Sequence, residues 1–188
     1  QLGQPEPVDT QTLFQIASTT KAMTAATVGR LVDQGKLEWD DPVSEHLSTF
    51  ELSDPYATRE MRVRDLLTHR GGLPNTDFLW YPVARPSDEV AALLRHVKPA
   101  YSLRSDFVYQ NVMYMMAGQV VQSTSGQPWG EFLREQLLAP LDMERTALGT
   151  LEARELGNVA VDHRRTGGTI RPLSDRYVAA DEPLGPAG

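Results

Sequence analysis

Apolar residues recur at helical spacing along most of the chain, and glycine, proline and short polar turns separate the helical stretches. Between Ser18 and Gln34 the apolar positions share one helical face, and Gly35 follows where a glycine commonly ends a helix. Ser87 is expected to cap a further helix at its N-terminus. The same spacing predicts helices over 43–47, 62–68, 88–97, 111–123 and 128–140.

A strand pattern is found only near the end of the chain. Residues 159–161 and 169–171 flank Gly167 and Gly168, and this combination predicts one β-hairpin. The opening stretch to about Asp9 is rich in proline and is expected to form a loop or an edge strand. Periodicity alone therefore predicts a mostly helical protein with very little sheet.

Composition narrows the class of protein. The chain has 188 residues, 40% of them hydrophobic and 23% charged, which is typical of one globular domain. A net charge of -7 argues against a nucleic-acid binder, which needs a basic face for phosphates. The sequence has no cysteine, and this excludes disulfides, a thiolate nucleophile and cysteine-ligated zinc.

The ends of the sequence suggest a fragment. It begins at Gln1 without a methionine, so we expect the natural N-terminus to lie upstream, and it stops at Gly188 in an apparent loop. No apolar run approaches the roughly 20 residues of a membrane span, so no transmembrane segment is predicted. These features leave the compartment open, whether periplasmic, secreted or cytoplasmic, and they leave the oligomeric state open as well.

The first candidate site pairs Ser18 with Lys21. A serine hydroxyl is a weak nucleophile until a base removes its proton. Positions i and i+3 lie on one helix face, so the Lys21 amine would lie near the Ser18 hydroxyl. Burial favours the neutral form of a lysine, and the N–H groups at a helix start favour a developing oxyanion. The alternative is that Ser18 only caps the helix and Lys21 is solvated, since Ser-x-x-Lys is a loose pattern.

The second candidate site is Tyr109-Gln110-Asn111. Alternate residues of an extended turn point the same way, so Tyr109 and Asn111 would face one cleft. Tyr109 would move a proton between Ser18 and a leaving group. Asn111 offers a donor and an acceptor, for the lysine and for a substrate carbonyl. The alternative is a core tyrosine followed by a helix-capping asparagine.

Five segments, in order, resemble the serine β-lactamases and penicillin-binding-protein-like hydrolases, with class C β-lactamases and family VIII carboxylesterases as the closer branch. They carry the Ser-x-x-Lys and Tyr-x-Asn motifs, the run after the first helix, a Leu-Leu-Thr-His segment and a Pro-Leu-x-Met segment. Asp142 replaces the family's usual glycine in the last of these. The segments span 14–21, 35–43, 63–74, 107–111 and 140–146.

The resemblance implies an α+β, β-lactamase/transpeptidase-like fold, in which an antiparallel sheet flanked by helices and a helical region enclose the active site. It implies that Ser18 is the nucleophile, Lys21 the general base, Tyr109 the proton shuttle and Asn111 a contact to substrate or lysine. It implies no cofactor and no metal. Gln110 stands where the family often has serine or alanine, and this middle position is expected to tolerate the change.

The family's third motif, a Lys-Thr-Gly or His-x-Gly strand, is not evident. Arg165-Thr166-Gly167 resembles it but falls at the predicted hairpin turn, a composition common in turns. His69 and His163 are expected to be structural or loop residues, because neither pairs with a serine and a carboxylate. Residues 1–188 are therefore expected to form a single incomplete domain, mainly the helical region with one β-hairpin. Its N-terminal strands and C-terminal third-motif strands would be absent, and activity in isolation would be low.

Three functions are compatible with these motifs. The first is a serine hydrolase that forms an acyl-serine intermediate with an ester, a β-lactam or a peptidoglycan-like peptide. The second is a penicillin-binding or sensor-type protein that is acylated with little turnover. The third is a non-catalytic structural homologue, against which the intact Ser18, Lys21, Tyr109 and Asn111 argue. A fluorophosphonate or fluorescent penicillin label separates the first two from the third.

Overall fold

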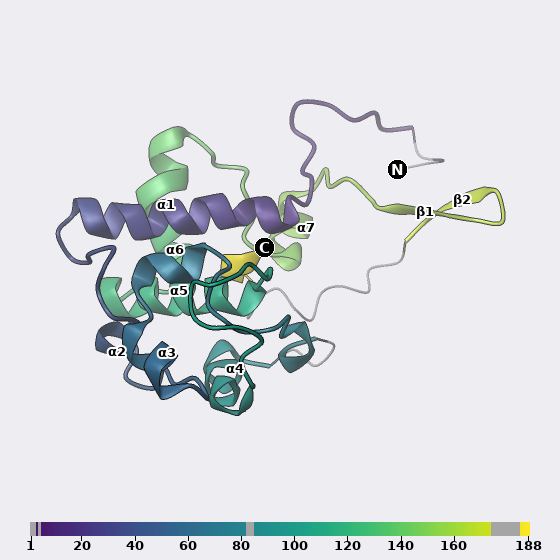
Figure 1. The fold of residues 1–188 in the computed structure, drawn as a ribbon. Helices are drawn as coiled ribbons and strands as arrows, with labels where there is room; N and C mark the ends of the chain where they lie inside the picture. The colour runs from purple at the N-terminus through teal and green to yellow at the C-terminus, as the bar shows by residue number, and fades with distance from the viewer. Residues whose placement is uncertain (1–2, 4, 82–84, 174–184) are drawn as a thin grey trace.

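The computed structural model describes residues 3, 5–81, 85–173 and 185–188, which form a helical body and a β-hairpin that extends away from it (Figure 1). The two strands, β1 (His163–Thr166) and β2 (Thr169–Pro172), are antiparallel. The helices are α1 (Thr20–Asp33), α2 (Val43–His46), α3 (Pro55–Glu60), α4 (Ser87–Leu93), α5 (Asn111–Ser125), α6 (Trp129–Leu133) and α7 (Thr150–Leu156). Short 3₁₀ or π turns extend or join several of them.

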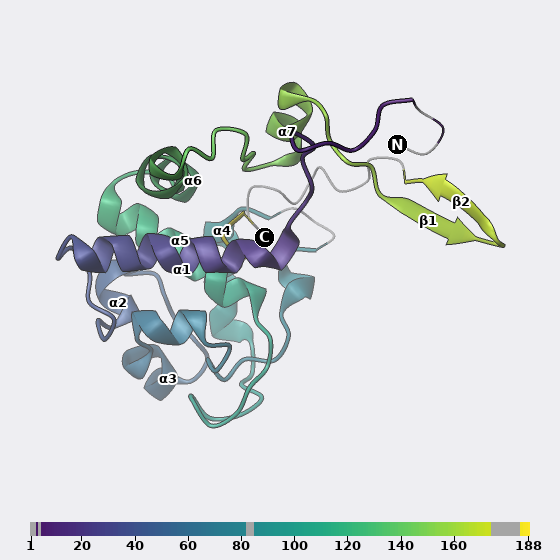
Figure 2. The same ribbon diagram turned by 90° about the horizontal axis from the view of Figure 1, so that it is seen from above.

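Helix α5 is the centre of the helical body and packs along α1 (Figure 2). Every residue from Val112 to Val121 is buried except Gln119, so α5 is covered on all sides. Val28 and Leu31 of α1, both fully buried, belong to the same core. Because α5 is packed on all sides, the position of its first residue, Asn111, is fixed as well.

Helix α1 ends where Gly35 predicts that it should. Gly35 has φ +66°, in the left-handed region, as predicted for a glycine after a helix. Its N–H donates to the Val32 carbonyl (2.9 Å), and the Lys36 N–H donates to the Leu31 carbonyl (3.0 Å). This pair of bonds satisfies the last carbonyls of the helix and turns the chain away, which confirms the predicted helix end.

The ion pair between the buried Asp65 and the partly exposed Arg104 ties together two segments of the helical body. The side chain of Asp65 is only 7% exposed, and it accepts hydrogen bonds from Arg104 Nε (2.9 Å) and Nη2 (2.6 Å). It also accepts the Arg62 N–H (2.8 Å). Because a buried carboxylate needs such partners, this network fixes the 3₁₀ turn Val63–Leu67 against the loop that leads to Tyr109.

The hairpin is present, but its first strand was predicted too early. Gly167 and Gly168 have φ +57° and +82°, which is the two-residue turn that pairs Thr166 directly with Thr169. Residues 159–161 therefore fall outside the strand, and Val159 forms an isolated parallel bridge with Leu13. The turn geometry, more than the β-propensity of the flanks, sets the register.

Other helix boundaries differ from the sequence prediction. Ser87 is the first residue of α4 and makes no capping bond, and Pro86 precedes the helix instead. The predicted helix over 88–97 divides into α4 and a 3₁₀ turn, Leu94–His96. The stretch that begins after Pro128 passes from α6 into a π turn and then a 3₁₀ turn. Helices α3 and α7 carry too weak an apolar periodicity to have been predicted.

Candidate functional site

Lys21 lies at the centre of the candidate site. Its residue is only 7% exposed, and its Nζ lies within hydrogen-bond distance of three oxygens. These are Ser18 Oγ (3.1 Å), Asn111 Oδ1 (2.7 Å) and the Ala187 carbonyl (2.6 Å). Three segments that lie far apart in the sequence therefore meet at one amine. The alternative of a solvated Lys21 does not describe this structure.

Ser18 lies in the 3₁₀ turn Ala17–Thr19, directly before α1, and its residue is exposed to solvent. Ala17 has φ +43°, a left-handed conformation that costs a residue with a Cβ some free energy. Gly188 packs against this turn so closely that a Cβ there would lie 2.8 Å from the Ser18 backbone N. The exposed Ser18 hydroxyl thus lies beside the buried Lys21 amine, on a turn against which Gly188 packs.

Tyr109 faces the same amine through its ring. The ring centroid lies 4.7 Å from Lys21 Nζ, and the ring of Tyr114 lies 5.3 Å from it on α5. Both contacts are within the range of cation–π attraction. Tyr109 is 39% exposed, and among the described residues its hydroxyl has no hydrogen-bond partner. The hydroxyl is therefore free to meet a ligand.

Asn111 is oriented by an acidic neighbour. Its Nδ2 donates to Asp77 Oδ1 (3.1 Å), and this bond directs the amide oxygen toward Lys21. Asp77 itself exchanges hydrogen bonds with Asn75. No side-chain capping bond is found at the start of α5, so Asn111 does not serve as the helix cap of the alternative interpretation. Asp77 could not be predicted from the sequence, because it lies 34 residues from Asn111 and belongs to no motif.

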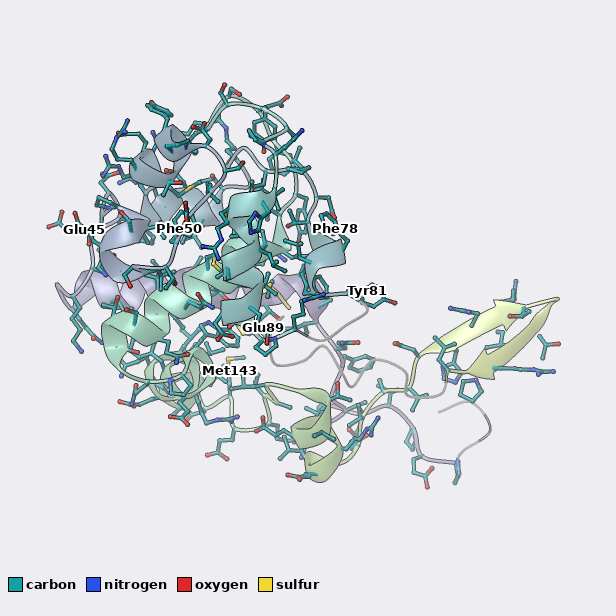
Figure 3. All side chains as sticks on the ribbon, turned by 90° about the horizontal axis from the view of Figure 1, so that it is seen from below. Glu45, Phe50, Phe78, Tyr81, Glu89 and Met143 are labelled. Carbon is teal, nitrogen blue, oxygen red and sulfur yellow. The ribbon has the colours of Figure 1, made fainter. Side chains whose placement is uncertain are left out.

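Two exposed aromatic side chains follow Asp77 in the sequence. Phe78 and Tyr81 are 67% and 52% exposed, and Figure 3 shows them on the side of the helical body from which the hairpin extends. Tyr114, by contrast, is largely buried and donates its hydroxyl to the Leu67 carbonyl (2.8 Å). Burial, together with the nearby Tyr109, raises the pKa of Tyr114, so its phenol stays protonated.

The segment 185–188 is bound between α1 and α5. Thr24 Oγ1 donates to the Pro186 carbonyl (2.6 Å), and the ring of Pro186 packs on Gly118 of α5. These contacts bring the next carbonyl, that of Ala187, to Lys21. Sequence reasoning missed this acceptor, because a backbone carbonyl has no residue signature.

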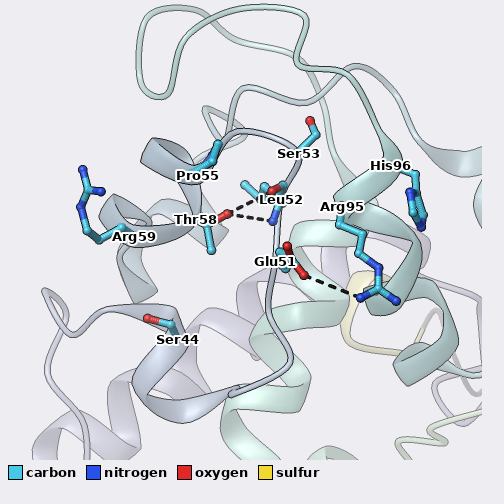
Figure 4. A pocket seen from close by; sticks show the side chains of 9 residues that line it. All are labelled: Ser44, Glu51, Leu52, Ser53, Pro55, Thr58, Arg59, Arg95 and His96. Atoms are coloured by element: carbon cyan, nitrogen blue, oxygen red, sulfur yellow. Dashed lines mark hydrogen bonds and ion pairs between the residues drawn. The ribbon is translucent and has the colours of Figure 1, made fainter.

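The helical body also has a surface pocket that lies away from the candidate site. It has a volume of about 460 Å³, and the Glu51–Arg95 ion pair (3.7 Å) lies on its wall (Figure 4). It contains none of the predicted site residues. Its lining consists of Ser44, Glu51, Leu52, Ser53, Pro55, Thr58, Arg59, Arg95 and His96.

The described residues contain neither a metal-binding cluster nor a membrane-spanning helix. No group of three or more histidine, cysteine or acidic side chains there is arranged to hold a metal ion. In the same part of the chain, no helix has the length and apolar character needed to cross a membrane.

Comparison with known proteins assigns the chain to a family. A family model described as Beta-lactamase matches residues 1–187, so the chain belongs to the β-lactamase family. This membership confirms the resemblance and the β-lactamase/transpeptidase-like fold predicted from the motifs. Relatives of the chain include proteins named as an amidase, a putative D-alanyl-D-alanine carboxypeptidase and a hydrolase, so the family is one of hydrolases.

Three relatives illustrate the match. The unguisins hydrolase ungD' of Aspergillus campestris is 31% identical over 161 residues, which is 80% of this chain and 30% of that protein. Penicillin-binding protein 4* of Bacillus subtilis is 27% identical over 97% of this chain and 40% of its own length. The solved D-amino acid amidase of Ochrobactrum anthropi SV3 has a TM-score of 0.72 at 28% identity, over 96% of this chain and 51% of that one. The chain thus spans only part of the length of each relative.

Proposed function

We propose that Ser18 is the nucleophile of an acyl-serine hydrolase and that Lys21 is the base that activates it. The observation that carries this proposal is the set of three oxygens around Lys21 Nζ. Two of them, the Asn111 amide oxygen and the Ala187 carbonyl, only accept hydrogen bonds. The third, the Ser18 hydroxyl, also donates.

This difference favours one arrangement of a neutral amine. A neutral lysine has two N–H donors and one lone pair. The short contacts to Asn111 (2.7 Å) and Ala187 (2.6 Å) occupy both donors. The lone pair then points at the remaining neighbour, the Ser18 O–H at 3.1 Å, and receives its proton. The same three contacts hold the ammonium that this transfer creates, so no rearrangement is needed.

The proposed reaction has two stages. Ser18 Oγ attacks the substrate carbonyl carbon while its proton passes to Lys21 Nζ. Tyr109 gives its phenolic proton to the leaving group and regains a proton from the Lys21 ammonium. The bond between the carbonyl carbon and the leaving group breaks, and an acyl-serine remains. Water then attacks the carbonyl carbon of the acyl-serine, the bond from that carbon to Ser18 Oγ breaks, a proton of the water passes to Oγ, and the acyl group leaves as a carboxylic acid.

The substrate is proposed only by class. An ester, a β-lactam or a peptide amide presents the carbonyl that this chemistry requires. The relatives support that range, since one is named an amidase, one a penicillin-binding protein and one a hydrolase. Asn111 is proposed to contact the substrate carbonyl in addition to Lys21.

Turnover of a nitrophenyl ester and of a chromogenic cephalosporin by the full-length protein tests the proposal. Ser18→Ala and Lys21→Ala should each lower the rate at least 100-fold. Ser44→Ala and Lys98→Ala, two changes outside the site, should leave it unchanged. A normal rate in Lys21→Ala would reject the assignment of the base. Acylation of Ser18 without turnover would favour the penicillin-binding or sensor-type alternative.

A further inference from the structure

His69 contacts three consecutive residues around the proposed proton shuttle. Its carbonyl accepts the Val108 N–H (3.1 Å), and its Nδ1 accepts the Gln110 N–H (3.1 Å). Between these two bonds, the imidazole stacks on the ring of Tyr109, with centroids 4.3 Å apart and planes 28° from parallel. One residue thus holds the backbone on both sides of Tyr109 and the face of its ring.

His69 is itself held firmly. Its φ of +59° lies in the left-handed region, which is strained for a non-glycine residue and persists only where the surrounding structure imposes it. The surroundings here include the Tyr101 hydroxyl on its carbonyl (3.3 Å) and the rings of Phe107 (5.6 Å) and Tyr114 (5.3 Å). A strained residue with so many contacts is suited to positioning a neighbour.

Tyr109 needs such support. It is 39% exposed, and its ring stacks on His69 and lies against Lys21 Nζ. A half-exposed tyrosine without a stacking partner would visit other rotamers, and fixing it would then cost conformational entropy in each catalytic cycle. The stack on His69 removes that freedom before a ligand arrives.

We propose that His69 is the positioning residue that aims the Tyr109 hydroxyl at the substrate, and that only its neutral imidazole can do so. This inference rests on the proposed function of Tyr109. A protonated imidazole has no lone pair at Nδ1, so it cannot accept the backbone N–H that follows Tyr109. Protonation would therefore release one of the three contacts.

The surroundings of His69 favour the neutral form. The titratable groups that face it are Lys21 on α1, Tyr114 on α5, and Tyr101 and Tyr109 from the neighbouring loop. None of these carries a negative charge near neutral pH. Burial, and the positive charge of Lys21 whenever its amine is protonated, lower the pKa of His69 below its ordinary 6.5, so the imidazole is neutral at physiological pH.

The experiment measures the rate at which a fluorophosphonate labels Ser18 in the full-length protein, as a function of pH. His69→Asn is the main variant, because asparagine tolerates positive φ and cannot titrate. His69→Gly, which also suits the backbone, is the second variant. His96→Asn, at the exposed last residue of the 3₁₀ turn Leu94–His96, is the matched control. Near-ultraviolet circular dichroism checks that each variant is folded.

The proposal predicts coupling between His69 and Tyr109. His69→Asn and His69→Gly should slow labelling about tenfold, and His96→Asn should not change it. In a Tyr109→Phe background, His69→Asn should slow labelling less than twofold, because the hydroxyl that it positions is already gone. The wild-type rate should also fall on acidification below about pH 6.5, with a limb that His69→Asn removes.

Two results would overturn the proposal. One is labelling of His69→Asn within twofold of the wild-type rate with the same pH profile. The other is an equal loss in the Tyr109 and Tyr109→Phe backgrounds, which would mean a general structural role. A failure of the proposed function gives a different result, since Ser18→Ala would then be labelled as fast as wild type, and both proposals would fall.

Discussion

Replacing Gly118 by alanine tests whether the segment 185–188 must stay packed on α5. A methyl carbon at residue 118 would lie 2.8 Å from Pro186 Cβ and closer still to Pro186 Cγ. Nonbonded carbon atoms settle at about 3.5–4.0 Å. A helix backbone and a proline ring both resist deformation, so the segment must move by about 1 Å to make room.

That displacement has two consequences of known size. Overpacking costs about 1–3 kcal/mol, and alanine in a helix interior returns about 0.5–1 kcal/mol, so we expect a net loss of up to about 2.5 kcal/mol. The bond from Lys21 Nζ to the Ala187 carbonyl, 2.6 Å long, would lengthen to about 3.6 Å and cease to be a hydrogen bond. Losing this hydrogen bond would remove about 1.4 kcal/mol of stabilisation from Lys21, the base, and would slow acylation of Ser18 about tenfold.

The matched control is Gly29→Ala, in the interior of α1. A methyl carbon there would lie 3.8 Å from the Trp39 ring, which is an ordinary contact. Gly29→Ala should therefore raise the free energy of unfolding by about 0.5–1 kcal/mol and leave labelling unchanged. Urea unfolding and fluorophosphonate labelling of the full-length protein measure both quantities. Gly118→Ala with the stability of Gly29→Ala and a wild-type labelling rate would refute the reasoning.

Three further predictions each concern one residue: Asp142, Asp77 or His69. Asp142 has φ +53°, so Asp142→Gly should raise the free energy of unfolding by about 0.5–1 kcal/mol; a lower urea midpoint would contradict this. Asp77→Ala frees the Asn111 amide to rotate and should slow Ser18 labelling about threefold to tenfold, whereas an unchanged rate would show that the bond has no role. Because the pKa of His69 is lowered, the native protein binds fewer protons than the unfolded chain just below pH 6.5. The contribution of His69 to stability is thus complete above pH 6.5 and is lost as pH falls through the lowered value. The urea midpoint should fall less steeply with acid in His69→Asn, and parallel slopes would contradict the prediction.

The parts of the site that are local in sequence could be predicted from sequence. Ser18 and Lys21 are three residues apart at the start of one helix, and Gly35 ends that helix with the expected positive φ. Tyr109 and Asn111 flank a single residue. The expectation that position 110 tolerates glutamine in place of the family's serine or alanine stays a prediction. Its side chain is fully buried and donates to the Leu73 carbonyl (2.5 Å).

The parts that depend on tertiary packing could not be predicted. The contact between Lys21 and Asn111 spans 90 residues; the chemistry of the amide and the family resemblance suggested it, but neither predicted its geometry. The Ala187 carbonyl and Asp77 had no signal at all, because neither a backbone acceptor nor a lone carboxylate indicates its partner. The early placement of the first strand has a similar cause, since β-prone residues at 159–161 pair elsewhere, with Leu13.

The position of a covalent adduct tests the central claim most directly. The full-length protein is treated with a fluorophosphonate, digested and mapped by mass spectrometry. We predict one modified peptide, ending at Lys21, with the adduct on Ser18, and at least a 100-fold slower reaction in Lys21→Ala. An adduct on any other residue, or labelling of Ser18 at an unchanged rate in Lys21→Ala, would contradict the proposed roles of the pair.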